Sequence, residues 1–171
     1  MRASTFFAAA AALATTVSAG MVPTFAKRYN ITQAWGEWEV TNFTASSHPS
    51  SSSIDFLIFW DKGNSGPVHC NANGYSVGGE GNWYACESNN TPSGNFHFSL
   101  NQDWNNLSLS QDMYQIGSIV HLNGSAPFEI KWGFSTAGSE ATADPFYVPV
   151  LSESHTLPNG TTTAPEFSSR K

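Results

Sequence analysis

One segment of this chain has the residue types and spacing of a catalytic motif. Residues 74–78 read Gly-Tyr-Ser-Val-Gly, which matches the nucleophile elbow of α/β hydrolases. An elbow needs a strand, a sharp turn and a following helix to expose its serine. Gly79 and Gly81 follow at once, and the chain then reaches Cys86, so no helix can begin there. The sequence therefore predicts a glycine-rich loop in which Ser76 has no nucleophilic role.

Histidines and carboxylates show no recognisable metal or acid–base arrangement. The five histidines, at positions 48, 69, 97, 121 and 155, lack the short spacings of metal ligands. His97 alternates with Phe96 and Phe98, so we expect it to point to solvent from a strand. Glycoside hydrolysis by two carboxylates stays an open alternative, because it depends on a separation of about 5 to 9 Å that sequence does not reveal. We expect no catalytic residue, no metal and no cofactor.

The two cysteines, Cys70 and Cys86, each lie in a strand-like run on either side of the glycine-rich loop. In a secreted chain, two thiols are most simply interpreted as one intramolecular disulfide. The bridge would close a loop of 15 intervening residues, which is worth roughly 3 kcal/mol. The sequence thus predicts a stapled β-structure.

The elements that carry these residues are predicted to be strands. Short aromatic and β-branched runs recur between turn residues, and no apolar stripe keeps helical spacing for more than two turns. Ile54–Trp60 is nearly continuous apolar, so we expect a central strand covered on both faces. The fold class is all-β, a single antiparallel β-barrel or sandwich domain stapled by one disulfide. The predicted strands are Trp35–Asn42, Ile54–Trp60, Val68–Ala72, Trp83–Glu87, Phe96–Leu100, Leu107–Gln111, Ile119–Leu122, Phe128–Phe134 and Phe146–Leu151.

Processing signals divide the chain of 171 residues into four parts. Residues 1–19 are predicted to be a signal peptide, with a positive start and a small-residue cleavage site, and are too short to span a bilayer. Residues 20–28 are a predicted pro-segment ending in the dibasic pair Lys27-Arg28. Residues 29–151 form the β-barrel domain, and residues 152–171 form a disordered Ser/Thr/Pro-rich tail. We expect a secreted, extracellular glycoprotein, with candidate glycosylation sites at Asn30, Asn42, Asn89, Asn106, Asn123 and Asn159.

Charge and aromatic content narrow the partners. Beyond residue 28, four basic residues face thirteen acidic ones, which gives a net charge of −9. With only Lys62 and Lys131 as cations inside the domain, nucleic acid and anionic membranes are not expected partners. The tryptophans either fill the core or form a sugar-stacking platform, and Trp104, flanked by polar residues, is the least core-like. The six are Trp35, Trp38, Trp60, Trp83, Trp104 and Trp132.

The order of the segments resembles the fungal secreted family typified by the Alternaria major allergen. The resemblance runs from about Trp35 to Leu151 and includes a closing Asp144–Leu151 strand. It rests on Cys70-x-Ala72, a glycine-rich loop, Trp83-Tyr84-x-Cys86, Phe96-x-Phe98 and Leu107-x-Leu109-x-Gln111, preceded by Trp38–Phe43 and Ile54-Asp55-Phe56.

The resemblance implies a secreted β-barrel without known catalytic residues, found as allergens and as elicitors or effectors of plant defence. Members are reported to engage plant thaumatin-like defence proteins, and the allergen to carry small phenolic ligands at a dimer interface. This chain lacks the additional cysteines of typical members, so a covalent dimer is not expected, and whether a small phenolic ligand binds stays open. We expect a non-enzymatic interaction protein with a basic host extracellular defence protein as partner. The alternative is a secreted carbohydrate-binding module or small carbohydrate-active enzyme.

Overall fold

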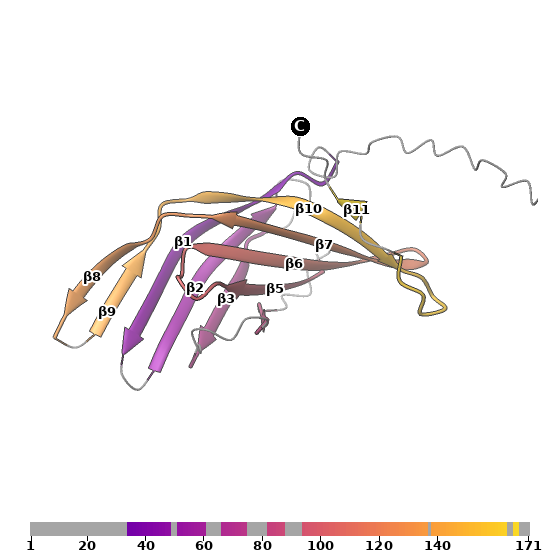
Figure 1. Ribbon diagram of the computed structural model, residues 1–171. Helices are drawn as coiled ribbons and strands as arrows, with labels where there is room; N and C mark the ends of the chain where they lie inside the picture. Colours follow the sequence, from indigo (N-terminus) through magenta and orange to yellow (C-terminus); the bar gives the residue numbers. More distant parts are fainter. Residues whose placement is uncertain are drawn as a thin grey trace, which may run out of the picture.

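The computed structural model describes residues 34–48, 51–60, 66–74, 82–87, 94–136, 138–163 and 166–167. The predicted signal peptide and pro-segment, Ser76, Asn30 and Asn89 lie outside these residues. The structure is one nearly closed antiparallel sheet, as the all-β prediction required (Figure 1). Its strands are β1 (Glu37–His48), β2 (Ser51–Trp60), β3 (Val68–Asn73), β4 (Tyr84–Ala85), β5 (Asn95–Leu100), β6 (Asn106–Gln115), β7 (Ser118–Pro127), β8 (Lys131–Ser135), β9 (Gly138–Thr142), β10 (Phe146–Thr156) and β11 (Glu166–Phe167).

The main sheet runs in the order β3-β2-β1-β10-β7-β6-β5-β4. β1 has two partners on the same side: β10 pairs with its first half and the β8–β9 hairpin with its second half. A register shift between Thr41 and Thr44 lies between the two halves, and Asn42 there has a φ of 54°. A bulge of this kind bends the strand, which lets β1 leave β10 and meet β9.

The barrel closes between β3 and β4, the two ends of the sheet path. The predicted Cys70–Cys86 disulfide is confirmed and joins β3 to the residue after β4, with a Cα–Cα distance of 4.1 Å. Next to it, the Glu87 amide donates a 2.8 Å hydrogen bond to the His69 carbonyl oxygen. Because β4 has only two residues, it offers little strand pairing, and the disulfide holds the two ends of the sheet together.

The interior is filled by side chains that alternate along the strands. Phe56 of β2 and Phe98 of β5 meet edge to face across the barrel, with ring centroids 4.9 Å apart. A second aromatic group, formed by Phe43, Phe128 and Phe146, packs where β1 bends. As predicted, Phe96 and Phe98 point inward, while His97 between them is half-buried on the opposite face.

One prediction about the strands is wrong, and β9 was not predicted. Ile54–Trp60 was expected to be covered on both faces, but in β2 only Ile54, Phe56 and Ile58 are buried and Phe59 is 37% exposed. The other side of the run, formed by Asp55, Leu57 and Phe59, faces solvent on the outer face of the barrel. Gly138–Thr142 forms β9 although it was not predicted, because its Gly-Ser-Glu-Ala-Thr sequence has little β-propensity and pairs only in context.

The predicted start of the disordered tail, at residue 152, is too early in the chain. β10 continues past Leu151 to Thr156, and β11 pairs with Ser152 and Glu153. Glu153 is only 7% exposed. Its carboxylate accepts a 2.7 Å hydrogen bond from Trp35 Nε1 and pairs with His155 Nε2 at 2.7 Å. The low apolar content of this segment hid its order, because polar partners rather than apolar packing hold it.

Trp104 is also a correction: it is 6% exposed and belongs to the core. It lies in the turn between β5 and β6, where Asn101 Oδ1 accepts hydrogen bonds from the amides of Asn105 and Asn106. The turn directs the Trp104 ring against Trp132, with centroids 5.6 Å apart. Its polar neighbours in sequence make the turn rather than an exposed platform.

Candidate functional site

The outer face of β3, β2, β1 and β10 carries acidic and aromatic side chains together. Glu39 of β1 is in register with Phe59 of β2 on one side and with Tyr147 of β10 on the other. Tyr147 is 57% exposed and its hydroxyl lies 3.5 Å from Glu39 Oε1. We call this surface the acidic face; it consists of Glu37, Glu39, Asp55, Phe59 and Tyr147, together with Glu87, which follows β4 and contacts His69 and Asn71 of β3.

His69 lies between two carboxylates of the acidic face. Its Nε2 is 2.7 Å from Asp55 Oδ2, and its Nδ1 is 3.1 Å from Glu87 Oε1. Asn71 Nδ2 donates a 2.8 Å hydrogen bond to the same Glu87 oxygen. The hydrogen bond to Asp55, followed by the one to Glu87, raises the pKa of His69 above its ordinary value of 6.5. Each ring nitrogen thus lies within reach of a carboxylate, an arrangement that favours the protonated imidazole.

When protonated, His69 offsets part of the charge of Asp55 and Glu87, and few other cations are present. Among the residues that the structure describes, Lys131 is the only lysine or arginine, and it forms a salt bridge with Asp144. The acidic face is therefore suited to a cationic surface, and its two exposed aromatic rings supply apolar contact area.

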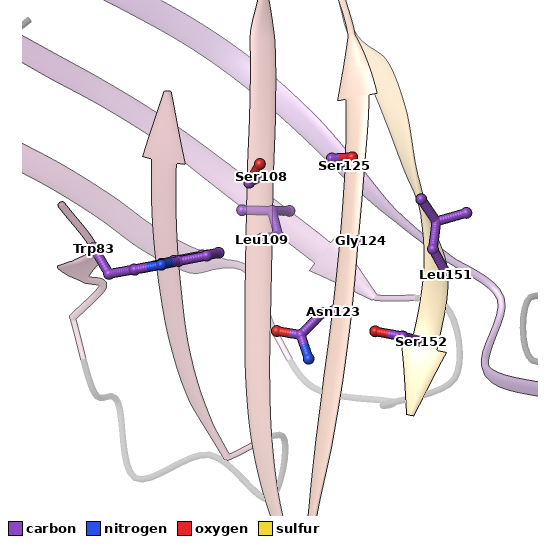
Figure 2. A pocket seen from close by; sticks show the side chains of 8 residues that line it. All are labelled: Trp83, Ser108, Leu109, Asn123, Gly124, Ser125, Leu151 and Ser152. Carbon is purple, nitrogen blue, oxygen red and sulfur yellow. The ribbon is translucent and has the colours of Figure 1, made fainter. Parts of the chain in front are cut away.

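A groove of about 290 Å³ lies on another part of the outer surface, over β6, β7 and β10. Figure 2 shows the Trp83 ring projecting toward Ser108 and Leu109, with Asn123 and Ser152 beside each other at the far side. Trp83 is 46% exposed. The residues around the groove are Trp83, Ser108, Leu109, Asn123, Gly124, Ser125, Leu151 and Ser152, and none has a charged side chain.

An acid, an imidazole and a hydroxyl are aligned at the opposite end of β6 and β7. Asp112 Oδ1 is 2.7 Å from His121 Nδ1, and His121 Nε2 is 2.8 Å from Thr156 Oγ1. The distances are those of a nucleophile relay. The Thr156 hydroxyl, however, also bonds the Thr162 hydroxyl at 2.9 Å, and Thr156 is paired with Ile119 within the sheet. We interpret the three side chains as a polar link between β6, β7 and β10.

The predicted modification sites fall in different environments. Asn42 and Asn159 are exposed, at the β1 bulge and in the turn after β10. Asn106 and Asn123 are half-buried, and Asn106 Oδ1 is buried without a hydrogen-bond partner. Sequence reasoning did not single out Trp83. The available signal was alternation, since Trp83 and Ala85 lie on the opposite side of the chain from the disulfide-bonded Cys86.

Comparison with known protein families, curated proteins and solved structures finds no match. The resemblance to the Alternaria allergen family therefore stays a prediction. Among the described residues, no group of three or more His, Cys, Asp or Glu side chains is arranged so that it could hold a metal ion. Within the same part of the chain, no helix has the length and apolar character to cross a membrane.

Proposed function

We propose that this chain is a secreted, non-enzymatic interaction protein that acts as an elicitor or effector. In this proposal the acidic face binds a basic extracellular protein of a plant host. The main support for this proposal is the row formed by Phe59, Glu39 and Tyr147, in which two exposed rings flank a carboxylate across three strands. The disulfide is compatible with the oxidising environment that secretion implies.

The row has the properties of a protein-binding surface. Tyrosine is enriched among the residues that dominate binding energy at interfaces, because it gives a large contact area at low entropic cost. The carboxylate of Glu37 and the net negative charge of the Asp55–His69–Glu87 group steer a cationic partner, and this attraction is screened by salt. Binding should therefore depend on ionic strength mainly through the association rate.

The direct test is surface plasmon resonance against basic extracellular plant proteins at about 0.05 M and 0.3 M salt. We expect saturable binding that is slower to form at the higher salt. Glu39→Lys should weaken it by about tenfold or more, and Tyr147→Ala by a similar factor.

Asp103→Lys is the matched control, since it makes the same charge change in the exposed turn between β5 and β6. If Asp103→Lys and Glu39→Lys weaken binding equally, net charge rather than the acidic face is responsible. Absence of saturable binding to any such protein would reject the proposal.

A further inference from the structure

The groove beside Trp83 has a composition that differs from the acidic face. One wall is the half-exposed indole of Trp83, and the other is the Leu151 side chain. Ser108 and Ser125 are directly opposed on β6 and β7, and both point outward because their strand neighbours are buried. The groove thus combines an aromatic ring with uncharged hydroxyl groups.

The β10 side of the groove depends on a bulge. Gly124 pairs with Val150 and Asn123 with Ser152, so Leu151 is the extra residue between them. At a bulge two successive side chains leave the ladder pattern, which here places both Leu151 and Ser152 along the groove. The amide of Asn123 and the hydroxyl of Ser152 then face the same space (Figure 2).

We propose that this groove binds a neutral saccharide, with one sugar ring stacked on Trp83. A pyranose has an apolar C–H face that packs on an indole and hydroxyl groups around its rim. Neighbouring strands place the serine and asparagine groups about 4.8 Å apart, which suits hydroxyls distributed along a sugar. With no charged side chain around the groove, an ionic ligand would have no counter-charge. The groove volume of about 290 Å³ is just below the usual range for small-ligand sites, which begins at about 300 Å³.

A neutral saccharide in this groove can come from either of two sources. Asn123-Gly124-Ser125 is an N-glycosylation sequon within the groove, so the chain's own glycan could lie against Trp83. The other source is a free polysaccharide. The two differ in whether Asn123 carries the sugar.

The first arm uses protein produced without N-glycans and with the disulfide formed. Titrating neutral hexasaccharides of β-1,3-glucose, β-1,4-glucose and β-1,4-N-acetylglucosamine should give saturable binding of at least one by calorimetry and tryptophan fluorescence. Trp83→Ala should weaken that binding by about tenfold. Trp83→Phe keeps a stacking face and should weaken it less. Tyr147→Ala, on the acidic face, should leave it unchanged, so that failure here is separate from failure of the proposed protein partner.

The second arm uses protein produced with N-glycans. If the chain's own glycan fills the groove, Trp83 is shielded from acrylamide quenching, free hexasaccharides do not bind, and Asn123→Gln reverses both effects. Asn159→Gln removes an exposed sequon elsewhere and should change neither. The proposal is overturned if unglycosylated protein binds none of the three hexasaccharides and Asn123→Gln does not alter Trp83 quenching. Equal binding by wild type and Trp83→Ala would also overturn it.

Discussion

The indole nitrogen of Trp38 donates a 2.8 Å hydrogen bond to Oε1 of Gln111, and both side chains are completely buried. Trp38 is on β1 and Gln111 on β6, and β10 and β7 lie between them in the sheet. The bond therefore crosses the barrel interior instead of joining neighbouring strands. A buried amide is tolerated in this aromatic core because it satisfies a buried donor.

Replacing Gln111 with leucine should lower the free energy of unfolding by about 1 to 3 kcal/mol. The substitution keeps the side chain's approximate size but removes the acceptor for the Trp38 N–H, which stays buried. Urea unfolding followed by fluorescence measures the change. Ser110→Ala, on the neighbouring outward position, is the control. An unfolding midpoint equal to that of wild type would show that the bond contributes nothing.

Gly124 is required by the close approach of β7 and β10. A Cβ there would lie 2.1 Å from the Pro149 carbonyl oxygen and 2.9 Å from Trp38 Cζ3. We expect Gly124→Ala to destabilise the barrel by about 1 to 3 kcal/mol, because backbone must shift. Gly133→Ala is the matched control: its Cβ meets nothing closer than 3.7 Å. Similar unfolding midpoints for the two variants would contradict this prediction.

The Cys70–Cys86 bridge should contribute about 2 to 5 kcal/mol to stability. It closes the barrel where β4 supplies only two residues of pairing. The variant with both cysteines changed to serine should unfold at lower denaturant concentration, and amides of residues 84–87 should lose protection from hydrogen exchange first. Wild-type mass spectrometry without reduction should show no free thiol. Two free thiols would exclude the bridge in the secreted protein.

The fold was predictable because alternation is a local property. Phe96 and Phe98 could be assigned to the core from a six-residue window. The disulfide could be predicted because the chain has two cysteines. What failed depends on distant contacts. Ser152 to Thr156 is ordered by β7 and by Trp35, and Trp104 is buried by Trp132, so neither could be inferred from adjacent residues.

The candidate binding surfaces were harder to predict from the sequence than the fold. That Phe59, Glu39 and Tyr147 share a row depends on the register of three strands that are far apart in the chain. The groove depends on the bulge at Leu151, which shifts the alternation of inward and outward side chains along β10 by one residue. Neither register nor bulge has a signature in composition or charge.

The raised pKa of His69 should make the stability of the folded protein depend on pH. Because Asp55 and Glu87 raise its pKa in the folded state, the stabilisation is fully present below the unfolded value of about 6.5 and is lost as pH rises through the folded pKa. Imidazole NMR titration should show a higher pKa for His69 than for the same residue in Asp55→Asn. His69→Gln should remove part of the stability difference between mildly acidic and alkaline pH. An Asp55→Asn variant with the wild-type titration midpoint would contradict the assigned cause.

Truncation after Leu151 should strongly destabilise the domain, whereas truncation after Phe167 should not. The shorter chain loses the β10 residues that pair with Ile119–Asn123 of β7, together with Glu153, the acceptor for Trp35 Nε1. At about 0.5 to 1.5 kcal/mol for each hydrogen bond, the loss should exceed about 3 kcal/mol and β7 would become an exposed edge prone to aggregation. The chain that ends at Phe167 keeps every one of these pairs and removes only four residues. Thermal unfolding of both chains provides the measurement. Equal melting temperatures would mean that residues 152–156 do not belong to the folded barrel, as the low apolar content of that segment predicts.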